Sequence, residues 1–218
     1  YLYAITDHGL YYVKENIAQN IYPTPLRSAL LSQKKDGILF IGGEFGLSAL
    51  KLDKNKIIDL GRISGFKRRV RTIAYDKPGN IWCGTNNYGV YKIPSFKIFS
   101  EDLKVIHFPL DRFPIKKISW VDVYTTRHSV LFSSEAGVFR YNPRKDKFEN
   151  DKVLGLDYSN NTKWIYPIVE DIHGNLILSM GMNNTFEKET MIAQYDNNSN
   201  SFSFIKEPFK RITDFSVE

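Results

Sequence analysis

The strongest constraint on the fold is a sequence pattern that returns about every 40 to 50 residues. Its fullest copy, residues 70–91, has two alternating apolar runs joined by the turn Asp76-Lys77-Pro78-Gly79-Asn80 and followed by a second turn, Asn86-Asn87-Tyr88-Gly89. Asp, Pro and Gly favour a tight hairpin, while Asn and Gly tolerate the left-handed backbone that the second turn requires. This copy therefore predicts three consecutive antiparallel strands.

Weaker copies of the pattern keep the same register along the chain. The glycines of the second turn are Gly9, Gly46, Gly89 and Gly137, which lie 37, 43 and 48 residues apart. Another copy of the first turn follows at Asp171-Ile172-His173-Gly174-Asn175, whereas the copy around residues 118–140 lacks that turn. The chain starts inside a unit at Tyr1, and a first-strand copy alone is found at residues 212–218.

A period of this length with several strands per unit is typical of a β-propeller and not of a helical solenoid. A fourth, outer strand is available in each unit, at Lys56–Leu60, Val105–Phe108, from Phe148 onward and at Phe202–Ile205. We therefore expect an all-β fold, a single β-propeller region over residues 1–218 with about five blades of four antiparallel strands. The predicted blade units are 1–25 (partial), 26–68, 69–117, 118–163, 164–211 and 212–218, the last being a single first strand.

The incomplete ends leave two arrangements open. A strand at Ile212–Val217 could complete the blade opened at Tyr1 and close a ring of five blades. Alternatively, the chain is an open section of a larger propeller, in which case it would expose apolar blade faces and strand edges. We then expect self-association or packing on further blades of a longer parent protein. The start at Tyr1, inside the pattern and without Met, also favours a piece of a longer protein.

Composition narrows the function classes. The chain is 42% hydrophobic and 25% charged, with a net charge of +6, which is typical of a globular protein. The densest basic cluster is Lys67-Arg68-Arg69 with Arg71, and we interpret it as ordinary charged surface, without nucleic-acid binding. No apolar run approaches the ~20 residues that span a membrane, so we expect no membrane contact by this segment. The single cysteine, Cys83, lies within a predicted strand, where we expect it to be buried.

The run from Ile73 through Asp76, Gly79-Asn80-Ile81-Trp82, Gly84-Thr85 and Gly89-Val90-Tyr91 closely resembles the two-component regulator propeller repeat. Residues 170–176 are a second good match, and residues 39–47 and 2–10 are partial ones. The resemblance implies the extracytoplasmic sensor region of a hybrid two-component system histidine kinase, hence a periplasmic location. It also implies a parent with seven-bladed propellers and a signal that is often an oligosaccharide.

Candidate ligand-binding residues follow from where propellers bind ligands. The loop between strands two and three and the loop entering strand one share one face, at the mouth of the central channel. Aromatic rings stack on sugar C–H faces, and amides and carboxylates bind hydroxyls. The candidates on these loops are Glu44, Arg69, Arg71, Asn86, Asn87, Tyr88, Trp120, Glu135, Trp164 and Tyr166. For Trp120 and Trp164, packing between blades is the alternative interpretation.

Other motifs have structural interpretations. Asp76 and Asp171 suit hydrogen bonds to the turn backbone, and Trp82 occupies a position that is bulky and apolar in every copy. The four histidines have no metal-ligand spacing, so no metal or cofactor is expected. No catalytic set can be picked out. The leading hypothesis is a non-enzymatic sensor fragment with an oligosaccharide ligand; the alternatives are a protein-interaction scaffold, or a polysaccharide lyase or glycosidase using Asp7, Glu44 or Glu135.

Overall fold

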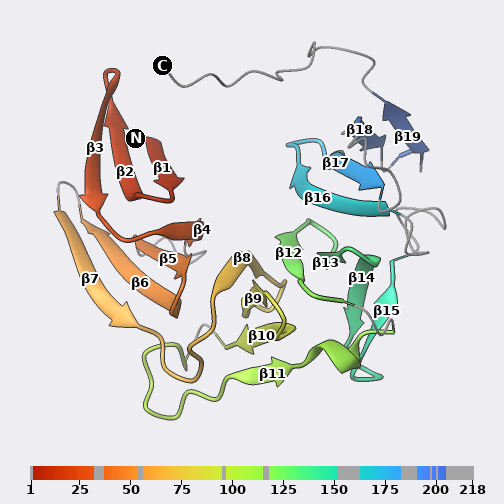
Figure 1. The fold of residues 1–218 in the computed structure, drawn as a ribbon, viewed down its shortest axis with the longest axis horizontal. Helices are drawn as coiled ribbons and strands as arrows, with labels where there is room; N and C mark the ends of the chain where they lie inside the picture. The colour runs from red at the N-terminus through yellow and green to blue at the C-terminus, as the bar shows by residue number, and fades with distance from the viewer. Residues whose placement is uncertain are drawn as a thin grey trace.

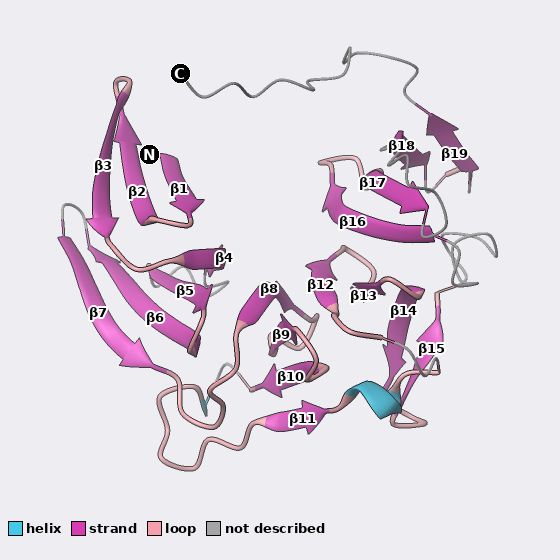
Figure 2. Cartoon of the chain, viewed as in Figure 1, coloured by secondary structure: helices cyan, strands magenta, loops and turns pink. Residues whose placement is uncertain are grey.

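In the computed structural model, five small antiparallel sheets stand side by side around a central opening (Figure 1). The structure describes residues 2–31, 37–53, 56–94, 97–114, 118–151, 163–182, 191–196, 198–199 and 201–204. Within these ranges the regular structure is β-strand, with the 3-10 helix η2 (Leu110–Arg112) following the third sheet and no α-helix (Figure 2). No helix in the described ranges has the length and apolar character needed to cross a bilayer.

Each sheet is a blade whose strands follow one another in chain order. Blade 1 contains β1 (Leu2–Thr6), β2 (Gly9–Lys14) and β3 (Ile17–Tyr22). Blade 2 contains β4 (Leu26–Leu31), β5 (Ile38–Gly43), β6 (Gly46–Asp53) and β7 (Lys56–Arg62), and blade 3 contains β8 (Val70–Tyr75), β9 (Ile81–Thr85), β10 (Val90–Ile93) and β11 (Ile106–Phe108). Blade 4 contains β12 (Asp122–Thr125), β13 (Val130–Ser134), β14 (Gly137–Asn142) and β15 (Lys147–Asn150). Blade 5 contains β16 (Lys163–Glu170), β17 (Leu176–Met182), β18 (Met191–Asp196) and β19 (Ser201–Phe204).

The expected propeller of four-stranded antiparallel blades is confirmed. Blades 2 to 5 each have four strands, and blade 1 shows three strands among the described residues. The predicted closing strand at Ile212–Val217 lies outside the described residues, so the choice between a closed ring and an open section stays a prediction.

The two turns of the repeat have the geometry that their residues suggest. Asp76 accepts hydrogen bonds from the backbone and side-chain nitrogens of Asn80, and Asp171 holds Asn175 in the same way. Gly79 and Gly174 have φ of 86° and 90°, in the left-handed region that favours glycine. The Asn80 and Asn175 contacts therefore give the Asp-x-x-Gly-Asn motif a structural role.

The hydrophobic core lies between blades. Alternate residues of one strand face opposite neighbours: Cys83 packs in the cluster shared by blades 2 and 3, and Trp82 packs in the cluster shared by blades 3 and 4. Trp82 is 2% exposed and lies against the rings of Phe108, Phe132 and Tyr141. Its indole Nε1 also donates to Asp76 Oδ2 at 3.0 Å, so the packing position is tied to the turn.

Close approach of the blades depends on a small residue near the end of the second strand. A Cβ on Gly84 would lie 2.2 Å from the carbonyl oxygen of Val121 in blade 4, and one on Gly42 would lie 2.6 Å from Val70 Cγ1 in blade 3. In blade 4 the same position holds Ser133, whose hydroxyl donates to the carbonyl of Ile165 in blade 5. This position therefore sets how closely neighbouring blades pack around the channel.

Candidate functional site at the channel mouth

Two sets of loops meet on one face of the propeller. The hairpin between β9 and β10 contacts the segment that enters β12, through a hydrogen bond from Asn87 N to Ser119 O of 2.6 Å and a bridge between Asn86 and Trp120. Likewise Glu44, between β5 and β6, binds Arg69, just before β8, at 3.0 Å. The loops between strands two and three therefore lie beside the loops that enter strand one, as the propeller prediction requires.

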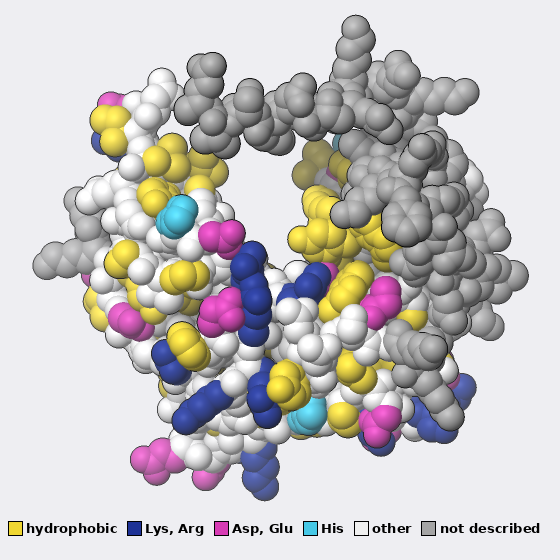
Figure 3. All heavy atoms as spheres, in the orientation of Figure 1, with side chains coloured by type: hydrophobic (Ala, Val, Ile, Leu, Met, Phe, Trp, Pro, Cys, Tyr) yellow, Lys and Arg dark blue, Asp and Glu magenta, His cyan; other side chains and the backbone are white. Residues whose placement is uncertain are grey.

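A cavity of about 400 Å³ opens among these loops, and blades 1 to 5 all contribute to its wall. Figure 3 shows basic and acidic side chains along the edge of the opening that the blades surround. The residues that line the cavity are Ile5, Thr6, Asp7, Leu26, Arg27, Arg69, Arg71, Thr72, Asn86, Asp122 and Tyr166. This volume falls within the range of about 300–1,000 Å³ that is usual for small-molecule sites.

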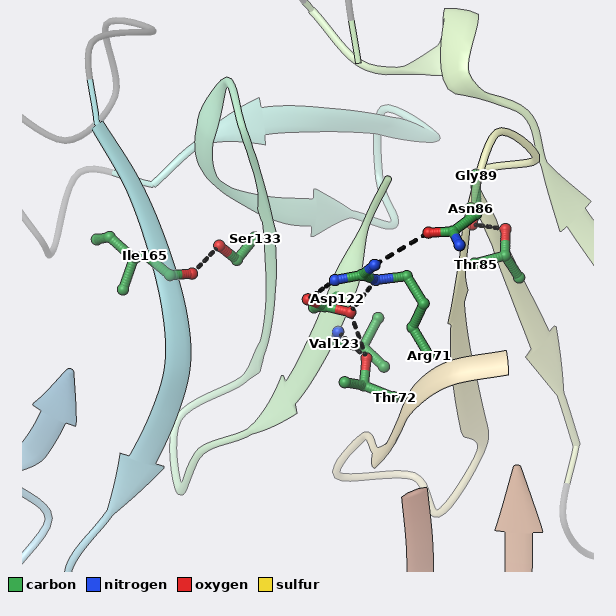
Figure 4. Close-up of polar contacts among 9 residues, drawn as sticks. All are labelled: Arg71, Thr72, Thr85, Asn86, Gly89, Asp122, Val123, Ser133 and Ile165. Atoms are coloured by element: carbon green, nitrogen blue, oxygen red, sulfur yellow. Dashed lines mark hydrogen bonds and ion pairs between the residues drawn. The ribbon is translucent and has the colours of Figure 1, made fainter. Parts of the chain in front are cut away.

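Arg71 is the best-anchored side chain of this wall (Figure 4). Its Nε and Nη2 donate to the two carboxylate oxygens of Asp122 at 2.7 and 3.0 Å, and its Nη1 donates to Asn86 Oδ1 at 3.0 Å. The guanidinium also lies over the Trp120 ring, 4.8 Å from its centroid. A bidentate pair of this kind fixes both distance and orientation, so Arg71 is held rigidly at the cavity.

The partner carboxylate is fully buried. The Asp122 side chain is 0% exposed, whereas that of Arg71 is 27% exposed. Burial alone would lower the pKa of Arg71, but the hydrogen bonds and negative charge of Asp122 outweigh it and raise the pKa, so the guanidinium stays charged. Burial also raises the pKa of the Tyr124 phenol, next on the same strand face, so that phenol stays neutral. The wall therefore presents a permanent cation backed by a buried anion.

Two further arginines of the wall are paired with carboxylates. Arg27 Nη1 lies 3.0 Å from Asp7 Oδ1, and Arg69 Nε lies 3.0 Å from Glu44 Oε1. All four side chains are at least one-third exposed, so these pairs are flexible surface contacts that contribute little to stability. They can exchange a carboxylate partner for a ligand without leaving a buried charge behind.

Four residues predicted from the sequence lie together in the cavity wall: Arg69, Arg71, Asn86 and Tyr166. The other six lie outside it. Glu44 binds Arg69, Trp120 packs on Arg71 and against Tyr166, and Glu135 accepts hydrogen bonds from the backbone and hydroxyl of Ser119. Asn87 and Tyr88 are exposed in the hairpin beside the cavity, and Trp164 is half-buried on β16.

Sequence reasoning missed Asp122, Arg27 and Thr72. Asp122 follows the apolar residue Val121, where a buried strand residue is the ordinary expectation, and its partner Arg71 is 51 residues away. The signal that could have found it is the charge itself, because an Asp on an inner strand is rarely fully buried unless it is paired. Thr72 belongs to the same network, since its hydroxyl accepts from the backbone of Val123.

Within the described ranges, no group of three or more His, Cys, Asp or Glu side chains has the arrangement of a metal site. Cys83 is fully buried between blades, and burial raises the pKa of its thiol, so it is an unreactive packing residue. Of the acids considered for catalysis, Asp7 lines the cavity, whereas Glu44 and Glu135 lie at its edge and beyond it.

Comparison with known families gives the repeat its name. Residues 64–87 match the family model described as two component regulator propeller. This stretch is therefore similar to one two-component regulator propeller repeat. That match covers the loop entering β8, the Asp76 turn and the start of the Asn86 hairpin, so it includes Arg69, Arg71 and Asn86. Among curated proteins, none matches the chain significantly.

Solved structures show the same fold at low identity. Two structures of the extracellular domain of BT4673 from B. thetaiotaomicron match with TM-scores of 0.64 and 0.62, at 17% and 19% identity. The first of these structures is named as that of a one component system, and the second as that of a hybrid two component system. The matches cover 93% and 98% of this chain but only 26% and 27% of those chains, so this chain spans about a quarter of the matched length.

Proposed function

We propose that this chain is part of the extracytoplasmic, periplasmic sensor region of a two-component signalling protein, and that it binds an oligosaccharide at the channel mouth. The propeller repeat at residues 64–87 and the likeness to an extracellular domain support a sensor role. The fragment is proposed to be non-enzymatic, and a histidine kinase is the proposed effector of its parent protein.

The composition of the cavity wall is the observation that supports an oligosaccharide ligand. Guanidinium groups, an amide and the half-exposed phenol of Tyr166 surround about 400 Å³. Amides and guanidinium groups hydrogen-bond sugar hydroxyls, and an exposed ring packs on sugar C–H faces. The scaffold Arg71–Asp122–Asn86 keeps these groups in place before a ligand arrives, which lowers the entropic cost of binding.

A thermal-shift screen with oligosaccharides tests this proposal. A ligand that binds only the folded state raises the melting temperature, and the rise grows with the logarithm of the ligand concentration once that exceeds Kd. We expect at least one oligosaccharide to do so, and Tyr166→Ala to abolish the shift while leaving the melting temperature of the free protein nearly unchanged, since Tyr166 is 45% exposed.

The matched control is Ile172→Ala, which removes an 89% exposed side chain from the β16–β17 turn, the turn at the C-terminal end of β16. This variant should keep the full shift. If no oligosaccharide stabilises the protein while a protein partner copurifies with it, the ligand proposal fails and the scaffold hypothesis replaces it.

A further inference from the structure

Outside the cavity, the channel-mouth face carries an arrangement that repeats in two adjacent blades. Phe45 and Tyr88 each precede the hairpin glycine of their blade, and their side chains are 61% and 41% exposed. An arginine covers each ring. Arg62, at the end of β7, has its Cζ 4.9 Å from the Phe45 centroid, and Arg68, in the loop that enters β8, has its Cζ 3.9 Å from the Tyr88 centroid. We call the two pairs the rim platforms.

The rim platforms differ from the other arginine sites of this face. Arg27, Arg69 and Arg71 are each bound to a carboxylate, whereas Arg62 and Arg68 form no ion pair with a carboxylate of the described residues. Each guanidinium is positioned by the ring beneath it, and Arg68 also hydrogen-bonds the Tyr91 phenol. Both arginines remain exposed, and guanidinium edges match the paired oxygens of a carboxylate or sulfate.

The platforms are continuous with the cavity. Glu44 directly precedes Phe45 and binds Arg69, and Arg69 both lines the cavity and directly follows Arg68. On the face shown in Figure 3, basic side chains lie directly beside hydrophobic ones over blades 2 and 3. A polymer leaving the cavity between these blades would therefore cross one platform or both.

We infer that the rim platforms bind the acidic groups of an oligosaccharide that carries uronate carboxylates or sulfate esters and extends from the cavity. This inference rests on the proposed function and specifies its ligand class. A neutral sugar would leave two oriented cations without an anionic partner. Carboxylates and sulfates satisfy them with charge-assisted hydrogen bonds, which are about twice as strong as neutral ones.

Titration calorimetry at low and high salt tests the inference with matched probes. One arm compares an oligogalacturonate with its methyl ester of equal length, and the other compares a dextran sulfate with dextran of equal length. We expect the acidic member of at least one pair to bind about tenfold or more tightly at low salt, and the difference to shrink at high salt because exposed charges are screened. The arm that responds identifies the acid as carboxylate or sulfate.

Variants assign the effect to the platforms. Arg62→Gln and Arg68→Gln should each weaken binding of the acidic probe several-fold and leave the neutral probe unchanged, and Arg68→Lys should restore only part of it. Arg144→Gln is the control, because it removes an exposed arginine from the turn between β14 and β15, at the other end of the strands. Circular dichroism and melting curves confirm that each variant is folded.

The outcomes are separable from those of the proposed function. Equal affinity for acidic and neutral probes, with the Tyr166→Ala loss retained, overturns the inference and leaves the oligosaccharide proposal standing. Tighter platform-dependent binding of poly-glutamate than of either acidic sugar overturns it in favour of an acidic protein partner. Binding of no sugar at all overturns both.

Discussion

At the scale of single residues, the most consequential positions are those where a side chain is absent. Gly84 allows the β9 backbone to approach the Val121 carbonyl of the next blade, and a Cβ there would overlap it at 2.2 Å. Its counterpart in blade 4 is Ser133, whose hydroxyl turns the same close approach into a hydrogen bond. In blade 4 the repeat therefore accommodates a side chain at this position because that side chain bonds across the interface.

Gly84→Ala should destabilise the protein by about 1 to 3 kcal/mol, as overpacking of a well-packed interior does. Chemical denaturation measures the change. Gly43→Ala is the control, because its Cβ would lie 3.1 Å from the Pro25 carbonyl and needs only a small adjustment. Equal losses for the two variants would show that the blade spacing does not depend on Gly84.

At the scale of elements, each blade is held by the side-chain contacts between its second strand and the next blade. Trp82 on β9 contacts rings from blades 3 and 4, and its Nε1 joins this interface to the Asp76 turn. In blade 5 the same position is Ile177, which is 41% exposed. Equivalent positions in the repeat thus differ sharply in what they contribute.

Trp82→Ala should cost about 3 to 5 kcal/mol of unfolding free energy, since it leaves a large cavity in the interface of blades 3 and 4. Trp82→Phe keeps part of the packing but removes the indole donor to Asp76, which keeps its hydrogen bonds from Asn80. We therefore expect a smaller loss that includes about 1 kcal/mol for the missing bond. Ile177→Ala, at the exposed equivalent position, should lower the unfolding free energy by much less than Trp82→Ala does. Denaturant unfolding of the three variants checks this order.

At the scale of the whole molecule, the sequence predicted the features that repeat from blade to blade. The recurring turn glycines were enough to predict the strands and their order, and the propeller fold then predicted the face on which two loop sets meet. What could not be predicted is specific to one pair of blades: the bond between Arg71 and Asp122, or the bond between Ser133 and the Ile165 carbonyl. These contacts depend on how blades rotate and pack against each other, and strand periodicity carries no information about that.

Cys83 reports on opening of the whole assembly, because it is 0% exposed between blades 2 and 3. Maleimide labelling in native buffer should be very slow and should accelerate with denaturant in step with global unfolding. Burial raises the thiol pKa in the folded state, so folding favours the neutral thiol, and stability should fall as the pH rises above the ordinary thiol pKa of about 8.5. Cys83→Ser labelling gives the background, and rapid native labelling would contradict the buried position.

Arg71 belongs at once to the wall of the cavity and to the joint between blades 3 and 4, since it binds Asn86 in one blade and Asp122 in the other. The width of the cavity and the angle of that joint are therefore not independent variables. Any molecule that occupies the cavity with an affinity that depends on this angle must, by thermodynamic reciprocity, bias the angle in return. In mechanical terms, the side chain couples a load at the mouth to a torque between two blades.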